Sequence, residues 1–413
     1  MARIHALREL LHHPLFPTIY LPALLYSIAQ MMIVPILPVY AAEFDVSYGL
    51  IGLVLAAGQL GRMVGDVPAG LVLRRIGRKP AMVIGLVGTA ISVAALFFAQ
   101  SIPEVVFWRL LTGISGALYN ISLHDFLSSE IVTASRGRSI ALIGGVWRAG
   151  KLIGPTIATS LALFGLRIPF LAVAVLVLIS AAIIIRNLPA EDRTKRKNDK
   201  VQGGHFWNVV RDNSRILAVS GLGQVFVQIT RAGSQAIIPL YATDVLNLSV
   251  QAVGPILSIS AALDFMLFYP AGWVMDHKGR RYAVVPSFVV QAIGLALIPL
   301  TTGFWGLLGA ASLIGLGNGI SAGTMMTIGA DLTPPETRGE FLGVWRLIGD
   351  MGSAGGPLIV GGVAGLLALG PSAWVIAGAS GAGATLFAFF IPETLKKKRS
   401  PMANAALVGA PED

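Results

Sequence analysis

The chain has 413 residues, of which 54% are hydrophobic and only 13% are charged, and its mean hydropathy is +0.73. An ordinary soluble domain carries about 25% charged residues, so this composition excludes that class and predicts a polytopic membrane protein. The net charge of +10 does not indicate nucleic-acid binding, because the basic residues form short clusters between apolar segments. The absence of cysteine excludes disulfides, thiolate metal sites and a cysteine nucleophile.

Twelve apolar segments are each long enough to cross a bilayer as a helix, which needs about 20 mostly apolar residues. In chain order they are 15–41, 48–73, 80–100, 104–126, 139–164, 168–187, 215–241, 250–275, 282–301, 304–329, 340–367 and 371–392. Connections after even-numbered spans are rich in Lys and Arg, whereas those after odd-numbered spans are short and nearly free of them. The positive-inside rule therefore predicts a multi-pass protein of the cell (inner) membrane with both termini in the cytoplasm.

A long, charged segment in the middle of the chain divides the spans into two sets of six. We predict an all-α polytopic membrane protein made of two pseudo-symmetric six-helix bundles. The predicted parts are an N-terminal bundle over 1–187, a cytoplasmic linker over 188–214, a C-terminal bundle over 215–395 and a disordered cytoplasmic tail over 396–413.

The two halves match under a single shift of 202 residues, the distance from Gly70 to Gly272. The matches are Pro68-Ala69-Gly70 with Pro270-Ala271-Gly272, Gly77-Arg78-Lys79 with Gly279-Arg280-Arg281, Gly113 with Gly315, Arg136-Gly137 with Arg338-Gly339, and Gly150, Gly154 and Pro155 with Gly352, Gly356 and Pro357. One shift that serves several separate matches indicates an internal repeat. Parallel halves of this kind are a known transporter architecture, in which the substrate site lies between the halves near the middle of the bilayer.

Three motifs stand out along this repeat. The loop motif after span 2 contains Gly70, Arg74, Gly77 and Arg78, and its second copy after span 8 contains Gly272, Asp276, Gly279 and Arg280. Span 4 contains Arg109-Leu-Leu-Thr-Gly113. Span 5 contains Gly150, Gly154 and Pro155, which remove bulk from one helix face and weaken the helix locally, so that it can bend or slide.

These motifs resemble those of the major facilitator superfamily, whose loop motif is G-x-x-x-D-[RK]-x-G-R-[RK]. The second-half copy matches except that His277 replaces a basic residue, and the first-half copy has Arg74 where the family has Asp. The span-4 motif resembles the family's span-4 arginine motif, and the span-5 motif resembles the one seen in its exporters and antiporters. The resemblance covers essentially the whole chain and implies a twelve-span transporter similar to drug and metabolite exporters.

Charged side chains within the spans are candidates for coupling and gating, because each costs about 2.5–3.5 kcal/mol in the bilayer and therefore needs a partner. The candidates are Arg62, Asp66, Arg148, Asp264, Arg346 and Asp350. The repeat equates Arg62 with Asp264 and Arg148 with Asp350. Since the family fold packs span 2 by span 11 and span 5 by span 8, we predict the ion pairs Arg62–Asp350 and Arg148–Asp264. Asp66 is expected to bind Arg346 or Arg62, and static pairs without a role in coupling are the alternative.

Arg109, Lys151 and Arg231 form a surplus of positive charge within the spans and are candidates for the substrate or proton path. A cationic cavity favours an anionic or zwitterionic substrate. The alternative is that Arg109 and Lys151 extend to a membrane interface. Tyr119 and Phe226 are aromatic candidates for the cavity lining.

The function that this pattern predicts is secondary active transport of a small organic molecule, with export by proton antiport, as in multidrug or metabolite efflux. A symporter or facilitator of an organic anion is the first alternative, and a non-transporting membrane sensor is the second. No clustered polar site indicates an enzyme, and the scattered histidines indicate neither a metal site nor a cofactor. The expected partners are the substrate, protons and the lipid bilayer, without nucleic acid, and we expect a monomer.

Overall fold

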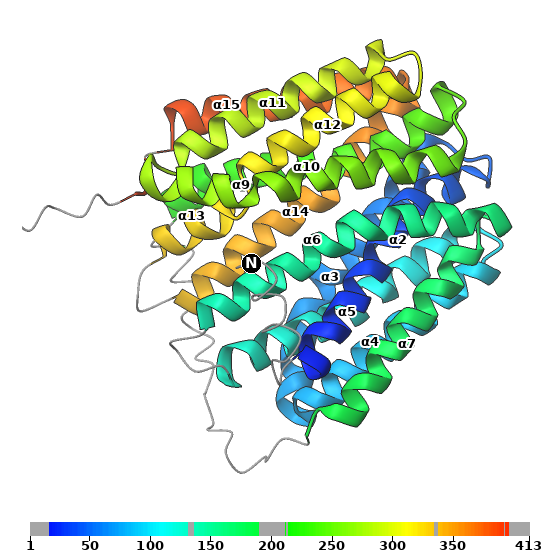
Figure 1. Ribbon diagram of the computed structural model, residues 1–413, viewed down its shortest axis with the longest axis vertical. Helices are drawn as coiled ribbons and strands as arrows, with labels where there is room; N and C mark the ends of the chain where they lie inside the picture. Colours follow the sequence, from blue (N-terminus) through cyan, green and yellow to red (C-terminus); the bar gives the residue numbers. More distant parts are fainter. Residues whose placement is uncertain are drawn as a thin grey trace, which may run out of the picture.

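The computed structural model describes residues 16–130, 136–189, 211, 214–333, 338–391 and 393–395, and every regular element in these ranges is a helix (Figure 1). Most of the predicted linker 188–214 and all of the predicted tail 396–413 lie outside these ranges. The predictions for those two segments, and for the domain boundaries that they define, therefore stay predictions.

The first half consists of six long helices. After a short π-helical turn at Phe16–Tyr20, these are α2 Leu21–Ala42, α3 Tyr48–Ile76, α4 Arg78–Phe98, α5 Ile102–Glu130, α6 Arg136–Leu161 and α7 Ile168–Asn187. Apolar side chains dominate these segments, and Pro35 and Pro38 occur inside α2. Proline is tolerated there because neighbouring helices satisfy the backbone groups that it frees.

The second half repeats this arrangement with one helix broken in two. Its helices are α9 Ser214–Leu240, α10 Val250–His277, α11 Arg281–Leu297, α12 Phe304–Ile320, α13 Thr324–Leu332, α14 Arg338–Leu366 and α15 Leu369–Phe389. The predicted continuous span 304–329 stops at Ser321, and α13 restarts after Gly323, whose φ of 81° lies in the left-handed region. Glycine adopts this conformation without steric cost, which explains why the break occurs there.

Nine helical segments in the described residues are long and apolar enough to cross a membrane, and α12 with α13 counts as one of them. The long helices α5, α6 and α9 complete a set of twelve and are less apolar. They carry Arg109, Lys151 and Arg231, respectively, within their length. The predicted fold class, a membrane protein with twelve helices and no strand among the described residues, is therefore confirmed.

The two ends of the helix bundle differ in charge. We call the end that contains Gly77 and Gly279 the basic end, and the end that contains the turns 43–47 and 246–249 the opposite end. The first described residues and residues 393–395 both lie at the basic end (Figure 1). The described chain thus enters and leaves the bundle on the same side.

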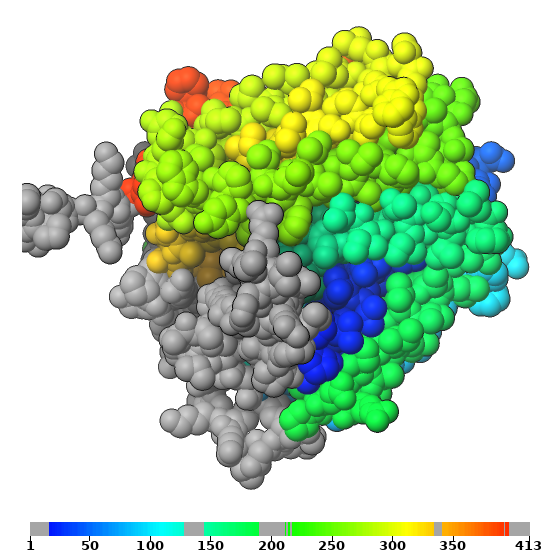
Figure 2. All heavy atoms as spheres, viewed as in Figure 1, coloured from blue at the N-terminus to red at the C-terminus, as the bar shows by residue number. Residues whose placement is uncertain are grey.

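The most extensive contacts between the halves are those of α3 with α14 and of α6 with α10, as the family fold predicted, and α2 also contacts α9 and α10. The contact is tight at the opposite end, where a Cβ on Gly52 would lie 3.1 Å from the Cα of Gly361. A Cβ on Gly254 would lie 3.0 Å from the Cα of Thr156, so α6 and α10 also touch backbone to backbone. From there the helices diverge toward the basic end (Figure 1), and Figure 2 shows the halves as two lobes that meet along α6 and α10.

Candidate functional site

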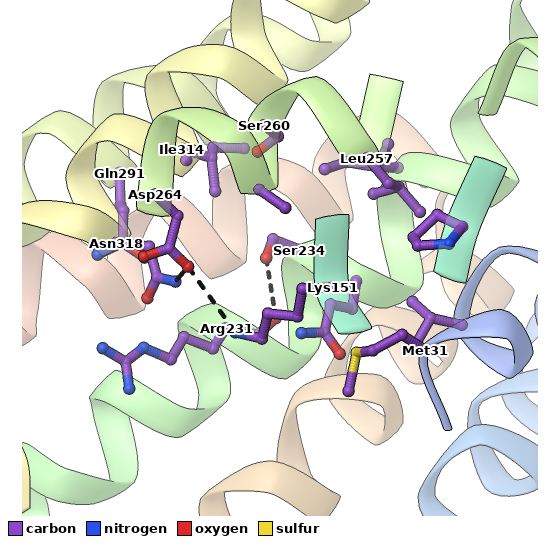
Figure 3. A pocket seen from close by; sticks show the side chains of 16 residues that line it. Met31, Lys151, Arg231, Ser234, Leu257, Ser260, Asp264, Gln291, Ile314 and Asn318 are labelled. Atoms are coloured by element: carbon purple, nitrogen blue, oxygen red, sulfur yellow. Dashed lines mark hydrogen bonds and ion pairs between the residues drawn. The ribbon is translucent and has the colours of Figure 1, made fainter. Parts of the chain in front are cut away.

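A cavity of about 90 Å³ lies between the two halves, and we call it the central cavity. Helices α2 and α6 line it from the first half, and α9, α10, α11 and α12 line it from the second. Its polar lining comprises Lys151, Arg231, Asp264, Gln291, Asn318 and three nearby hydroxyl or amide groups on α9 and α10 (Figure 3). Pockets for drug-sized ligands measure about 300–1,000 Å³, so this cavity holds only a small molecule unless the helices separate.

Asp264 lies at the middle of α10 and connects the halves. Its side chain is buried, with the residue 4% exposed, and its Oδ2 accepts a hydrogen bond of 2.8 Å from Nδ2 of Asn318. The Nζ of Lys151, from α6 of the other half, lies 3.9 Å from the same oxygen (Figure 3). The second oxygen, Oδ1, is buried and has no hydrogen-bond partner among the described residues. A carboxylate held by one amide and one distant ammonium is incompletely satisfied.

Arg231 contributes a second cation to the cavity wall from α9. Its Nη2 lies 3.4 Å from Oγ of Ser321, at the break between α12 and α13, and its Nε is buried without a partner in the described part of the chain. The charge of Asp264 also acts on this guanidinium. The cavity lining therefore has two cations and one acid, a surplus of one positive charge.

A second charged group lies nearer the basic end, and we call Arg62, Asp66, Arg346 and Asp350 the bridging cluster. The Nε of Arg346, on α14, lies 3.8 Å from Oδ2 of Asp66, on α3, and 3.9 Å from Oδ2 of Asp350, on its own helix. One guanidinium thus serves two carboxylates and crosses between the halves. This pairing of Asp66 with Arg346 is one of the two expected from the sequence.

The predicted direct pairs Arg62–Asp350 and Arg148–Asp264 are wrong, because neither is formed in the structure as described. Arg62 donates instead to Gln59, one turn away on its own helix, and acts on Asp66 and Asp350 only at longer range. Arg148 lies 4.0 Å from the ring centroid of Phe268 and donates to the backbone oxygen of Gly144 at 3.4 Å. Lys151, one turn further along α6, takes the place at Asp264.

Three other predicted residues do not line the central cavity. Arg109 is partly buried between α3 and α5, where its guanidinium fills the space beside Gly58. Tyr119 is fully buried in the first half, and its ring centroid lies 4.4 Å from that of Tyr26. Phe226 is partly buried against a hydrophobic cluster of the second half. Their predicted role in the substrate path stays without support from this geometry.

The span-5 motif places α6 against α2. A Cβ on Gly150 would lie 2.7 Å from the backbone carbon of Ser27, and one on Gly154 would lie 2.8 Å from the backbone oxygen of Ile28. Pro155 lines the central cavity one residue later. The motif therefore permits the close approach of two helices next to the cavity.

The loop motifs serve as turns held by ion pairs. Gly77 and Gly279 have φ of 88° and 124°, whereas a Cβ on Gly70 or Gly272 would meet nothing within 4 Å. Gly77 and Gly279 therefore make the turns of the two loops, whereas Gly70 and Gly272 make no close contact with another helix. Arg74 is exposed at the end of α3.

Each half also pairs the arginine of its loop motif with an acid from another helix. The Nε of Arg78 lies 2.7 Å from Oδ2 of Asp125, and the Nε of Arg280 lies 3.0 Å from Oδ2 of Asp331. Arg280 also lies 3.9 Å from Asp276, within its own motif. The repeat equates Asp331 with Ser129, one helical turn beyond Asp125, so the two halves reach the same arrangement from different positions.

Glu393, just after α15, binds the backbone of the second loop motif. Its carboxylate accepts hydrogen bonds from the backbone N–H groups of Arg280, Arg281 and Leu395 at 2.9, 3.0 and 2.9 Å. Burial acts to raise the pKa of this carboxyl, but the three N–H donors and the charge of Arg280 outweigh it and hold the pKa below its ordinary value.

Replacing Glu393 with glutamine is expected to lower the thermal stability near about pH 7, where the wild-type carboxylate is ionised. Because the folded-state pKa is lowered, the stabilisation is present above the ordinary pKa and is lost as the pH falls through the folded value. The difference in melting temperature between wild type and Glu393→Gln should therefore shrink below about pH 4. Glu43→Gln, at an exposed acid of the opposite end, is the control. A difference that does not change with pH would contradict the assignment.

Sequence reasoning missed the neutral partners of the site. Asn318 and Gln291 line the central cavity, and Ser321 contacts Arg231. The available signal was that amide side chains in apolar spans are themselves costly and need hydrogen-bond partners. Glu393 and Asp331 lie outside the compared motifs and carried no signal of this kind.

Comparisons with known proteins agree with this architecture. The family model of the Major Facilitator Superfamily matches residues 19–230 and 220–408. The "Uncharacterized MFS-type transporter MJ1560" of Methanocaldococcus jannaschii is 23% identical over 82% of this chain and 88% of its own length. "Multidrug resistance protein MdtH" of Escherichia coli is 24% identical over 72% of this chain and 73% of its own length. The crystal structure of nucleoside transporter NupG superimposes with a TM-score of 0.73 at 15% identity, over 90% of this chain and 98% of that one.

Proposed function

Because the chain belongs to the Major Facilitator Superfamily and is a multi-pass membrane transporter rather than an enzyme, we propose that it exports a small organic molecule in exchange for protons. The similarity to a protein named for multidrug resistance supports the direction of transport. The basic loops support a cytoplasmic location for the basic end, in the inner membrane of the cell.

The observation that carries this proposal is the buried carboxylate of Asp264, which lies between the halves and whose one ion pair among the described residues, at 3.9 Å, is with Lys151 of the other half. A carboxylate in a low-dielectric interface changes its proton occupancy when solvent access or its partner changes. Protonation of Asp264 removes the attraction to Lys151 and loosens α6 from α10. Deprotonation restores it, so proton binding and the separation of the halves are linked.

The bridging cluster supplies the second element of the proposed cycle. Arg346 connects α14 to Asp66 on α3 on the basic side of the central cavity. The helices touch at the opposite end and diverge at the basic end (Figure 1). The alternate state requires the reverse, and the distance between Arg346 and Asp66 must then change. These residues are therefore proposed as a gate, with Asp350 as the competing acceptor for the same guanidinium.

A specific observation also favours a second candidate function, the symport or facilitated movement of an organic anion. Lys151 and Arg231 outnumber Asp264 in the cavity lining. A cavity with net positive charge concentrates anions and disfavours cations. The two candidates differ in whether the proton and the substrate move in opposite directions, in the same direction or independently.

The test uses the purified full chain in liposomes that contain a pH-sensitive dye. A panel of labelled lipophilic cations, neutral drugs and small organic anions is added with and without an imposed proton gradient. Antiport predicts that substrate uptake releases protons from an acid-loaded lumen and that collapse of the gradient abolishes accumulation. Uptake of protons together with the substrate would establish symport instead, and flux that ignores the gradient would establish a facilitator. Binding of panel compounds without flux of any of them would contradict transport.

A further inference from the structure

The central cavity contains a set of buried hydrogen-bonding groups without partners. Oδ1 of Asp264, Oε1 of Gln291 and Oδ1 of Asn318 are acceptors of this kind, and Nε of Arg231 is a donor, all within the described residues. An unpaired buried polar group costs about 1–3 kcal/mol, so four of them around one cavity indicate a place that a polar occupant completes. Asp264 and Gln291 are only 4% and 3% exposed.

The orientation of the two amides follows from their other contacts. Nδ2 of Asn318 donates to the carboxylate of Asp264 at 2.8 Å, and a carboxylate only accepts, so the amide oxygen is the free atom. Nε2 of Gln291 donates to Oγ of Ser287 at 2.9 Å and to its backbone oxygen at 3.4 Å, which leaves Oε1 free. The walls from α10, α11 and α12 therefore present acceptors and require a ligand that donates hydrogen bonds.

The cation pair imposes a second requirement. Lys151 engages Asp264 at 3.9 Å, longer than a hydrogen bond, so its ammonium retains donors for another acceptor. Arg231 has only a weak contact of 3.4 Å with Ser321 and an unpaired Nε. With one acid against two cations, the cavity is one negative charge short of neutrality. A single carboxylate near Lys151 and Arg231 satisfies both the charge and the free donors.

The volume of the central cavity limits the size of the ligand. A cavity of 150 Å³ binds benzene, and the central cavity measures about 90 Å³. Benzene has six non-hydrogen atoms, so the smaller space in this conformation suits a ligand of about four, and a hydroxy acid of about six fits when the helices move apart slightly. Larger substrates of the same chemistry require the halves to separate.

From these three requirements we propose that the central cavity recognises a small organic monoanion that carries a hydrogen-bond donor beside its carboxylate, as in hydroxy acids. The carboxylate lies toward Lys151 and Arg231, and the donor lies toward Asp264, Gln291 and Asn318. This inference rests on the proposed transport function, because it names the substrate class of that cavity.

The test measures equilibrium binding of three matched probes to the purified full chain in lipid nanodiscs. Lactate is an anion with a hydroxyl donor, propionate lacks the hydroxyl, and lactamide has the hydroxyl without the charge. We expect lactate to bind at least about tenfold more tightly than either of the others, because a site built for a hydrogen bond rejects the analogue that lacks it. Equal binding of all three, or no binding of lactate, would overturn the proposal and leave water as the occupant.

Two variants separate the requirements. Arg231→Gln should abolish the preference for lactate over lactamide, and Gln291→Met should reduce the preference for lactate over propionate. Arg167→Gln removes an arginine that donates to backbone oxygens outside the cavity and should leave both preferences unchanged. Should Arg231→Gln keep the full preference for the anion, the assignment of the carboxylate position is wrong.

Binding and transport fail in different ways. Lactate binding with the expected preferences but no flux in liposomes would refute the proposed transport while the ligand class stands. Flux of other compounds with no preference for lactate would refute the ligand class while transport stands.

Discussion

Replacing Asp264 with asparagine is expected to abolish accumulation driven by a proton gradient. The amide keeps the size of the side chain and the contact with Asn318 but binds no proton in the physiological range. The change also leaves the half-buried ammonium of Lys151 without its carboxylate partner. Removing one member of a fully buried pair costs about 3–5 kcal/mol, and because the Lys151 side chain is 34% exposed we expect a smaller loss of stability, seen as a lower melting temperature that accompanies the loss of transport. The measurement is uptake in liposomes together with thermal unfolding of the same preparation.

The double variant Asp264→Asn with Lys151→Met separates coupling from folding. Methionine replaces the ammonium with an unbranched apolar side chain, so the cation nearest to position 264 is removed together with the acid. We expect the double variant to recover most of the lost stability and none of the proton-driven accumulation. Recovery of both would mean that Asp264 serves only to neutralise Lys151. A single variant that still accumulates substrate at the wild-type rate would remove Asp264 from the proposed mechanism.

The sequence alone could predict the helices and their pairing across the halves. The bilayer requires the same apolar length of every span and the same charge bias of every cytoplasmic loop. The twelve segments can therefore be recognised from composition alone. Among the described residues, the predicted span 304–329 is interrupted at 321–323, where α12 ends just before the left-handed Gly323. Glycine is common in membrane helices, so its presence did not signal a break.

The ion pairs could not be predicted in the same way, because a repeat relates positions and says nothing of side-chain direction. Arg62 and Asp350 lie on adjoining helices, yet Arg62 donates a hydrogen bond to Gln59 of its own helix. The contact between α14 and α3 is made instead by Arg346, which pairs with Asp66. The side chains of arginine and lysine span about a helical turn, so a neighbour four residues away competes for the same carboxylate. At Asp264 it is Lys151 that forms the ion pair, whereas Arg148 lies over the ring of Phe268.

The contacts of α3 with α14 and of α6 with α10 are consequently similar in helix arrangement but differ in the side chains that form them. Asp66 corresponds to Phe268 under the repeat, and Asp350 corresponds to Arg148. On α3 and α14 the result is an arginine between two carboxylates, whereas on α6 and α10 it is an arginine on an aromatic ring. Among the described residues, only the first contact has carboxylates on the basic side of the central cavity, Asp66 and Asp350. The basic side of α3 and α14 is therefore the expected proton-sensitive contact, and α6 with α10 responds through Asp264 alone.

Replacing Arg346 with glutamine is expected to open the basic end further and to uncouple transport from the proton gradient. Without the guanidinium, the charges of Asp66 and Asp350 repel each other, and only Arg62, at longer range, offsets them. Arg346 is 44% exposed at its side chain, so the bridge contributes only about 0–1 kcal/mol to stability. A loss of about 1 kcal/mol still changes the ratio of two states about fivefold, which suffices to shift a conformational equilibrium.

The absence of native cysteine makes this shift measurable, because two introduced cysteines carry the only spin labels. Arg186→Cys and Lys278→Cys place labels at exposed residues of the basic end, one on each half. We expect Arg346→Gln to move the distance distribution toward longer values, and Arg346→Lys, which keeps the charge, to move it less. A distribution unchanged by Arg346→Gln, with proton-coupled uptake intact, would show that the contact with Asp66 is static and that the gate lies elsewhere along α3 and α14.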